Sequence, residues 1–498
     1  MNRRDFLKIA AGSAVLMAGC DSALILHNQG SAKRRPNLVF FLIDDMGWRD
    51  AGCFGSTFYE TPNIDRLATQ GIRFTNAYAA CPVCSPTRAS IMTGKYPARL
   101  NLTDWIPGRQ SNMKLRAQMK VLPPEFEQQL GLEEVTIAEV LKEVGYVTCS
   151  VGKWHLGGQA YYPEKQGFDV NIAGGQWGSP PSYFYPYRRG NSKAFDLPGG
   201  QEGEYLTDRL TNEAVKFIEA NKDRPFFLYL SHYAVHVPLQ AKQEMTDRYE
   251  RKAAGLPAND TGKFLPEGAT QARQVQDHAV YAAMVESMDQ SVGRVMTKLD
   301  ELGIADNTVI IFMSDNGGLS TAEGSPTSNM PLRAGKGLLY EGGIREPMII
   351  KWPGIVKPGS VCNEPVISTD FYPTILQMTG LPLRPEQHID GVSLVPLLRK
   401  GTGRLQDREL YWHYPHYSNQ GGKPSGAVRA GDYKLIEFYE DNRVELYNLK
   451  QDIGERHDIA GQMPEKVSEL RELLRGWRQQ VGARMPMPNP YYEAEKAK

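Results

Sequence analysis

The stretch Asn37-Leu-Val-Phe-Phe-Leu-Ile43 ends abruptly at Asp44-Asp45, and this pattern indicates the fold class. The run is too short for a helix and is rich in β-branched and aromatic residues, which is typical of a strand buried on both faces. Further runs of this kind, each followed by polar residues, cover 146–151, 225–230 and 308–313. These strands predict a large, mostly parallel sheet that helices cover on both sides.

Helical patterns separate these runs, at 136–144, 206–221 and 280–302. In the last of them, apolar residues recur at helical spacing, at Val280, Met284, Met288, Val292, Val295 and Leu299. Alternating strands and helices define an α/β fold, in which ligands bind beyond the carboxyl ends of the strands. We therefore expect the polar residues that follow the four runs to meet at one edge of the sheet.

The sequence pattern changes after about residue 400. Two strand-like runs, 433–438 and 443–447, flank a turn and predict a hairpin, and an amphipathic helix with Pro464 near its start follows them. We predict a large domain over 36–400, a small α+β subdomain with an antiparallel sheet and a helix over 401–485, and a tail over 486–498.

The N-terminus is predicted to be a targeting segment rather than part of the fold. Arg3-Arg4 forms a twin-arginine pattern, and the apolar run after it is too short for a comfortable transmembrane helix. Leu16-Met-Ala-Gly19 before Cys20 is similar to a bacterial lipoprotein cleavage site, and ordinary signal cleavage nearby is the alternative. The twin-arginine export machinery would carry the folded protein to the periplasm or cell surface. We expect a signal peptide over 1–19, a lipid on Cys20 and a tether over 20–35.

The overall charge points to no polyanionic partner. Lys and Arg total 57 residues, and Asp and Glu also total 57. We therefore expect no nucleic-acid partner, and membrane contact through the lipid anchor alone. Six cysteines in 498 residues do not predict a disulfide framework. Small buried thiols are the favoured interpretation, although spacing leaves pairing open, for Cys53, Cys81, Cys149 and Cys362.

The segment Pro82-Val-Cys-Ser-Pro-Thr-Arg-Ala-Ser-Ile-Met-Thr-Gly94 contains the candidate nucleophile, Cys84. Pro86 suits the first turn of a helix, which places Cys84 near a helix N-terminus, where the dipole attracts anions. Arg88 lies four residues after Cys84 and shares its helix face. A helix end and a guanidinium together suit a tetrahedral anion or its monoester. The alternative for Cys84 alone is a buried structural thiol.

Two pairs of oxygen-bearing side chains, Asp44-Asp45 and Asp315-Asn316, each follow a predicted strand. Oxygen ligands of this kind suit Ca²⁺ or Mg²⁺ rather than zinc. Taken separately, each pair could instead cap a helix or form a turn. Together at one sheet edge, they predict a site for a hard cation that acts as a Lewis acid.

Lysine and histidine side chains complete the candidate site. Lys153 and His155 follow a predicted strand, where Gly152 allows a close approach of the backbone. His236 and Lys336 lie in less distinctive segments. The alternatives are solvated lysines and structurally satisfied histidines.

The Cys84 segment and a second one, Gly145-Tyr-Val-Thr-Cys-Ser-Val-Gly-Lys-Trp-His155, occur in the order found in a known family. With the segments around Asp44, His236, Asp315 and Lys336, the chain resembles the type I sulfatases of the alkaline phosphatase-like superfamily over nearly all of 36–480. Thr87, where serine is commoner, is an allowed variant. The resemblance implies an alkaline phosphatase-like catalytic domain that hydrolyses sulfuric esters.

The resemblance also implies a role for each candidate residue. A formylglycine-generating maturation enzyme would convert Cys84 to formylglycine, whose hydrate attacks the sulfur of a sulfate ester. A calcium ion would be held by Asp44, Asp45, Asp315, Asn316 and the modified side chain of residue 84. Arg88 and Lys153 would stabilise the nucleophile and the sulfuryl oxygens. His236 and Lys336 would bind sulfate and help protonate the leaving alcohol. His155 would then take a proton from the remaining hydroxyl of residue 84, which expels sulfate and regenerates the aldehyde.

Exported bacterial members of this family commonly act on sulfated glycans, so a sugar sulfate ester of a polysaccharide or glycosaminoglycan is the expected substrate. Candidate sugar contacts are His413 and His416, in the aromatic run 411–417, together with Asn329 and Arg333. A packed subdomain interface is the alternative for the aromatic run. The rival functions are an arylsulfatase-like enzyme, a phosphomonoester or phosphonate hydrolase of the same superfamily, and a glycan-binding lipoprotein without catalysis.

Overall fold

The computed structural model describes residues 34–108, 117–193, 195, 197–257, 262–400 and 405–493. The predicted signal peptide, Cys20 and nearly all of the predicted tether lie outside the described residues. Arg35–Lys498 forms one compact unit. Within the described ranges, no helix combines the length and the hydropathy that a membrane span requires.

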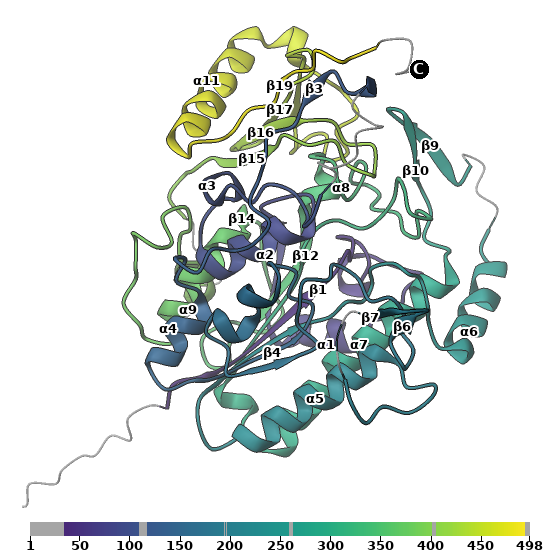
Figure 1. Cartoon of the computed structure of the whole chain (residues 1–498), viewed down its shortest axis with the longest axis vertical. Helices are drawn as coiled ribbons and strands as arrows, with labels where there is room; N and C mark the ends of the chain where they lie inside the picture. Colours follow the sequence, from purple (N-terminus) through teal and green to yellow (C-terminus); the bar gives the residue numbers. More distant parts are fainter. Residues whose placement is uncertain are drawn as a thin grey trace, which may run out of the picture. The chain divides into compact units, whose positions relative to one another are not determined.

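A nine-stranded sheet forms the centre of the molecule (Figure 1). From one edge to the other, its strands are β13 (Ser360–Cys362), β2 (Ile72–Tyr78), β12 (Arg345–Lys351), β11 (Thr308–Ser314), β1 (Asn37–Ile43), β8 (Phe226–Ser231), β4 (Val147–Gly152) and β5 (Val170–Ile172), with β14 (Val366–Ile367) paired to β2. Only β12 runs against the others, because it pairs antiparallel with both of its neighbours. The predicted mostly parallel sheet is thus confirmed.

Helices cover both faces of the sheet, as predicted (Figure 1). Strand β1 shows why, because Val39, Phe41 and Ile43 enter one core while Leu38, Phe40 and Leu42 enter the other. The helices of the first core are α1 (Pro62–Gln70), α5 (Leu206–Asn221), α6 (Gln243–Ala254) and α7 (Ala279–Glu301). Those of the second are α2 (Cys84–Thr93), α4 (Ile137–Glu143), α9 (Phe371–Met378) and α10 (Val395–Lys400).

Strand register brings the predicted polar segments to one edge. Strand β1 pairs in parallel with β11 and β8, with Ile43 opposite Ser314 and Leu42 opposite Ser231. Strand β4 is in register with β8, so Gly152 lies opposite Ser231. The residues that follow these four strands therefore leave the sheet at the same level, on its carboxyl edge.

The C-terminal subdomain packs against this edge of the large domain. Its four antiparallel strands are β15 (Leu410–Tyr414), β16 (Ser425–Ala430), β17 (Tyr433–Phe438) and β18 (Val444–Asn448). Helix α11 (Pro464–Gln480) buries Leu470, Leu474 and Trp477 against them. The predicted hairpin and helix are both present. Part of the predicted tail is a strand, because β19 (Met487–Pro488) pairs with β3 (Val121–Leu122).

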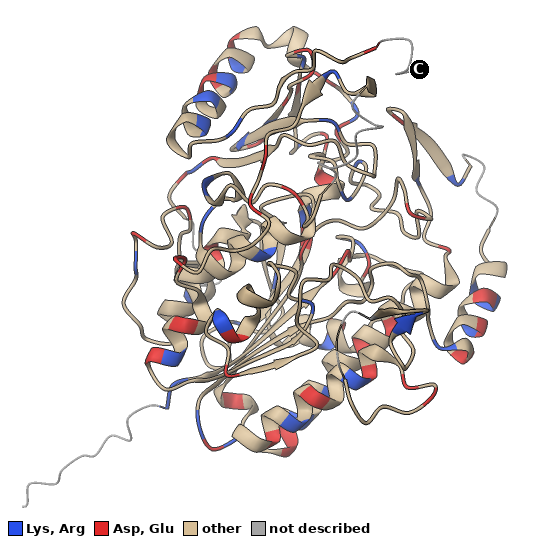
Figure 2. Ribbon diagram, viewed as in Figure 1, with Lys and Arg blue, Asp and Glu red and all other residues tan. Residues whose placement is uncertain are grey.

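Charged side chains of both signs are interspersed along the outer helices α5, α6 and α11 (Figure 2). The five described cysteines, Cys53, Cys81, Cys84, Cys149 and Cys362, are free thiols. Four of these five are buried, which agrees with the interpretation of small core thiols. Local charge, rather than a global field, must therefore build any anion site in the described part of the chain.

Candidate active site

Cys84 is the first residue of α2, and Val83 before it is extended, so the sequence places the thiol at a helix N-terminus as predicted. All ten residues of this helix are buried. Burial raises the pKa of the Cys84 thiol, and the nearby Lys153 and Lys336 only partly oppose this effect. The unmodified side chain is therefore a protonated thiol rather than the thiolate that a cysteine nucleophile requires.

Arg88, one turn further along α2, is fully buried and joins three strand ends to the helix. Its Nε donates to Asp315 Oδ2 at 2.9 Å, and its Nη2 lies 2.7 Å from the same oxygen. Its Nη1 donates to the Lys153 carbonyl at 2.8 Å and to Ser231 Oγ at 2.6 Å. These contacts fix the guanidinium beside the end of β11. Sequence patterns gave no indication of the role of Ser231.

Two lysines neutralise the acidic pair that follows β1. Lys153 Nζ lies 2.7 Å from Asp44 Oδ2, and Lys336 Nζ lies 2.7 Å from Asp45 Oδ1. Burial would raise the pKa of Asp45, but Lys336 and then His236 oppose this effect and hold the pKa below its usual value. Burial raises the pKa of Asp44 despite the opposing effect of Lys153.

The polar centre can accept a hard cation. Its three carboxylates and three cations, all buried, balance each other, so a bound sulfate ester would add an uncompensated negative charge. Asp44 Oδ1 and Asn316 Oδ1 are buried oxygens without a hydrogen-bond partner in the described part of the chain. Ligand atoms of Asp44, Asp45 and His236 lie within 4.8 Å of one another. These free oxygens, and the negative charge that a bound ester would add, both fit a Ca²⁺ or Mg²⁺ ion.

His155 faces the candidate nucleophile with one ring nitrogen. Its Nδ1 lies 3.3 Å from Cys84 Sγ, while its Nε2 lies 2.5 Å from the carbonyl oxygen of Ile106. A carbonyl only accepts, so Nε2 carries the proton and the Nδ1 lone pair points at residue 84. Burial and then the charge of Lys153 lower the pKa of His155, which keeps the ring neutral. This geometry suits a base.

His236 lies across the centre, with Nε2 3.5 Å from Asp45 Oδ2. Its Nδ1 contacts the carbonyl of Val237 at 2.8 Å. Burial lowers the pKa of His236 to about 3, with a further contribution from Lys336. The ring is therefore neutral before a substrate binds, whereas Asp45 raises the pKa of Lys336 against the effect of burial, so that Lys336 stays charged.

Unusual backbone conformations hold these side chains in place. Asp45 and His155 have φ angles of 61° and 59°, in the left-handed region that few residues other than glycine adopt. Gly152 has a φ of 95°, and a Cβ there would lie 2.0 Å from the carbonyl oxygen of Ser231. The glycine before Lys153 is thus required where β4 and β8 end together. Such strained positions cluster at functional sites.

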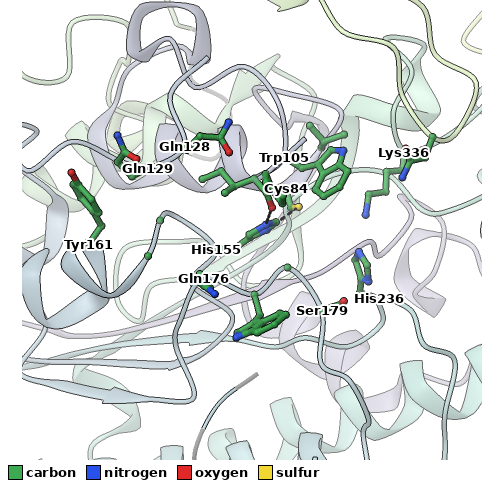
Figure 3. Close-up of a pocket in the computed structure, with 18 of the residues that line it drawn as sticks. Cys84, Trp105, Gln128, Gln129, His155, Tyr161, Gln176, Ser179, His236 and Lys336 are labelled. Atoms are coloured by element: carbon green, nitrogen blue, oxygen red, sulfur yellow. Dashed lines mark hydrogen bonds between the residues drawn. The ribbon is translucent and has the colours of Figure 1, made fainter. Parts of the chain in front are cut away.

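A cavity of about 810 Å³ opens over this centre (Figure 3). The candidate site residues Cys84, His155, His236 and Lys336 contribute to its wall. Its other walls carry aromatic and amide side chains that sequence reasoning missed, namely Trp105, Tyr161 and Trp177, and Gln128, Gln129, Gln176 and Gln420. These residues lie mostly in connecting segments without a motif, so no sequence signal distinguished them from other loop residues.

The four residues expected to contact sugar lie elsewhere. Asn329 is fully buried and donates from Nδ2 to the carbonyls of Gly318 and Ala334, both at 2.9 Å. Arg333 pairs with Glu267 at 2.8 Å. Neither side chain lines the main cavity. The backbone contacts of Asn329 and the ion pair of Arg333 hold both side chains in the packed segment that precedes Lys336.

His413 and His416, the other two candidate sugar contacts, are buried and hydrogen-bonded within the protein. His413 Nδ1 lies 2.8 Å from the Tyr439 hydroxyl, and His416 Nε2 lies 2.8 Å from Thr103 Oγ1. Both are buried and absent from the cavity wall. The aromatic run 411–417 instead seals the interface between the subdomain and the catalytic part, which was the alternative interpretation.

Comparison with known proteins identifies the class. The sulfatase family model matches residues 36–381, and a model described as the C-terminal part of N-sulphoglucosamine sulphohydrolase matches 334–480. A sulfatase from Formosa agariphila is 33% identical over 90% of this chain and 89% of its own. Human N-acetylgalactosamine-6-sulfatase is 34% identical, covering 89% of this chain and 79% of its own.

Solved structures agree with this result. The crystal structure of Ps i-CgsB in complex with k-i-k-neocarrahexaose is 31% identical, with a TM-score of 0.72 over 89% of this chain and 93% of its own. A phosphonate monoester hydrolase of Agrobacterium radiobacter, 20% identical with a TM-score of 0.60, shares the fold alone. The chain belongs to the sulfatase family, within the type I sulfatases of the alkaline phosphatase-like superfamily. It is a sulfuric ester hydrolase.

Proposed function

We propose that the protein is an exported sulfatase that hydrolyses sulfate esters on polysaccharide or glycosaminoglycan sugars, with formylglycine at position 84 and a calcium ion. The observation that carries this proposal is the placement of Cys84, 3.3 Å from His155 on the wall of a cavity that His236 and Lys336 share. Export and lipidation of Cys20 remain predictions from the N-terminal sequence.

Conversion of Cys84 to formylglycine would supply, through the hydrated aldehyde, an oxygen nucleophile that a buried thiol does not provide. The positive end of the α2 dipole and the charge of Lys153 would stabilise that oxygen as it becomes negative. Arg88 and Lys336 supply fixed charges for the sulfuryl oxygens. These charges are already oriented by Asp315 and Asp45, so little reorganisation is needed during the reaction.

A divalent cation held by Asp44, Asp45, Asp315 and Asn316 would supply Lewis-acid stabilisation of negative oxygen. The Oδ1 atoms of Asp44 and Asn316, which accept no hydrogen bond from the described residues, are the first ligands that we assign to it. Lys153 and Lys336 hold the remaining carboxylate oxygens of the acidic pair. These oxygen donors favour Ca²⁺, and Mg²⁺ is the second choice.

Acid and base roles follow from the two histidines. Hydrolysis breaks the bond between sulfur and the sugar oxygen, and the departing alcohol needs a proton. Lys336 and His236 both line the cavity and are the groups that we assign to supply this proton. The negative charge of a bound ester would raise the pKa of His236 toward protonation. His155 is neutral, with its Nδ1 lone pair facing residue 84, so it can take the proton whose removal releases sulfate.

The sugar assignment draws support from the cavity wall and from the relatives. Aromatic faces and amide groups are the side chains with which proteins stack on and hydrogen-bond to hydroxyl-rich ligands. Trp105, Trp177 and Gln176 offer such groups within the cavity. The names of the relatives, an N-acetylgalactosamine-6-sulfatase and a complex with neocarrahexaose, point in the same direction.

Paired substrates test this proposal. Protein co-expressed with a formylglycine-generating enzyme would be incubated with sulfated disaccharides and with the same sugars phosphorylated, and released anion would be measured. We expect sulfate release to exceed phosphate release by at least about a hundredfold in kcat/KM. Preferential phosphate release would instead support the phosphomonoesterase alternative. A lack of any release from modified protein would support the binding-protein alternative.

A further inference from the structure

A second cavity of about 370 Å³ adjoins the active-site cavity and shares Gln129 and Tyr161 with it. Figure 3 shows the order of the groups along the first cavity, with Lys336 and His236 at one end, Cys84 and His155 in the middle, and Gln129 and Tyr161 at the far end. The second cavity therefore begins where the first one ends, away from the sulfate-binding charges. A substrate longer than one sugar would reach it.

The wall between the two cavities is a fixed part of the fold. Gln129 and Tyr161 line both cavities, and Gln129 belongs to the segment 127–134, which lines the second cavity and whose main chain is anchored at two points. Glu127 N donates to the Asn101 carbonyl at 2.7 Å, and Leu130 N donates to the Leu156 carbonyl at 3.0 Å. The carbonyl of Tyr161 accepts from Trp154 Nε1 at 2.9 Å, next to the catalytic strand end. Fixed walls favour a site that is formed before its ligand binds.

Acidic side chains predominate over basic ones on the described wall of the second cavity. Its Arg99 is paired with Asp390 at 2.7 Å and its Glu134 with Lys95 at 2.6 Å. Among the described residues, none forms an ion pair with the other two acids of the wall, Glu127 and Glu133. Both carboxylates are exposed, and they can accept hydrogen bonds from hydroxyl groups and disfavour the approach of carboxylates and sulfates.

An apolar surface lies beside these acids. Leu132, on the same wall, is 52% exposed. Tyr161, which lines both cavities, offers a ring where they meet. An apolar face next to hydrogen-bond acceptors matches a pyranose ring, which has C–H faces and a rim of hydroxyl groups.

We propose that the second cavity is a subsite for an uncharged sugar joined to the sulfated one, so that the enzyme acts on oligosaccharides rather than on free monosaccharide sulfates. This inference rests on the proposed sulfatase function and adds the chemical class of the sugar next to the sulfated one. Binding energy gained there, away from the reacting sulfur, would raise kcat/KM for the longer substrate.

The test compares Glu133→Trp, which fills the second cavity, with Glu133→Gln, which keeps its size. Glu133 is exposed and lies outside the active-site cavity, so 4-nitrophenyl sulfate serves as the basal substrate for wild type and both variants. We expect all three to hydrolyse it equally. The oligosaccharide substrates are κ-neocarratetraose and chondroitin 6-sulfate tetrasaccharide. On the tetrasaccharide that the wild-type enzyme hydrolyses, we expect Glu133→Trp to lower kcat/KM about tenfold and Glu133→Gln to keep it within about twofold.

Each other result has a defined meaning. Unchanged oligosaccharide hydrolysis by Glu133→Trp would overturn the subsite, as would a wild type that cleaves the aryl sulfate but neither tetrasaccharide. Faster hydrolysis of the uronate-containing chondroitin substrate than of κ-neocarratetraose, whose neighbouring sugars are uncharged, would overturn the charge selection. Failure of modified wild type on the aryl sulfate as well would count against the proposed sulfatase function instead.

Discussion

The Nδ1 atom of His155 lies 3.3 Å from Cys84 Sγ while the Nε2 atom of the same ring contacts the carbonyl of Ile106 at 2.5 Å. The second contact determines the role of the first, because a carbonyl acceptor keeps the ring proton on Nε2. The position of the Ile106 carbonyl thus leaves the Nδ1 lone pair of His155 directed at residue 84. The predictions below follow from this centre and from the packing that supports it.

Replacement of His155 by alanine is expected to lower kcat by about 10²- to 10⁴-fold, the range typical of a lost general base, with little change in KM. Steady-state sulfate release by the formylglycine-bearing protein would measure the effect. The matched control is His457→Gln, because the side chain of His457 is 83% exposed. Equal rates in the His155 variant and wild type would remove this residue from the mechanism.

Calcium is expected to stabilise the folded protein as well as to support activity. A cation at a hundred times its Kd adds about 2.7 kcal/mol to the free energy of unfolding, so chelation should lower the Tm and calcium should restore it. Asp44→Asn should abolish this calcium-dependent shift, whereas Asp432→Asn, at an exposed position, should keep it. A Tm that is independent of calcium in wild type would argue against the cation site.

His413 and His416 are expected to affect stability rather than substrate binding. Burial lowers their pKa values from 6.5 to about 4 and about 3. Below pH 6.5 the unfolded chain therefore takes up protons that the folded protein does not. The contribution of the two histidines to the free energy of unfolding is fully present above pH 6.5. As the pH is lowered, it decreases by about 1.4 kcal/mol per pH unit for each histidine, until the pH nears 4 for His413 and 3 for His416.

Urea denaturation between pH 7 and pH 5 would measure this effect. The variant His416→Asn should show a shallower dependence of the unfolding free energy on pH than wild type, with unchanged KM. A raised KM at wild-type stability would return His416 to the substrate-binding residues.

Lys434 is expected to be essential to the subdomain interface. Its Nζ is buried between Glu341 and Glu455, at 2.9 Å from each. Lys434→Met removes the cation that Glu455 shares with Glu341, which keeps only its pair with Arg345, and should reduce the free energy of unfolding by about 3–5 kcal/mol. The control Lys450→Met removes a side chain that is 76% exposed and should cost less than about 1 kcal/mol. Equal losses in the two variants would contradict this assignment.

The strand ends were predictable because buried parallel strands are continuous apolar runs that stop where the chain leaves the sheet. Asp44, Lys153 and Asp315 all follow such runs, and the shared register of the strands then places them together. Strand β12 escaped this pattern because it begins with Arg345 and Glu346, two charged residues that tertiary contacts bury. Its reversed direction depends on pairing with distant strands, which local sequence does not specify.

The cavity wall could not be predicted for a different reason. Gln129 and Tyr161 belong to connecting segments, whose positions depend on anchoring contacts such as the one between Leu130 and Leu156. Conversely, His413 and His416 have the chemistry of sugar contacts but are buried by the packing of β15 and the segment after it. Residue type alone does not distinguish a buried hydrogen-bonded histidine from one that faces a ligand.

The central claim is that Cys84 is the precursor of the catalytic group and not the group itself. Mass spectrometry of the peptide that contains residue 84, from active protein purified from its native host, tests this claim most directly. We predict that the peptide carries the aldehyde of formylglycine, and that Cys84→Ala protein releases no sulfate. Active protein in which residue 84 remains an unmodified thiol would contradict the account.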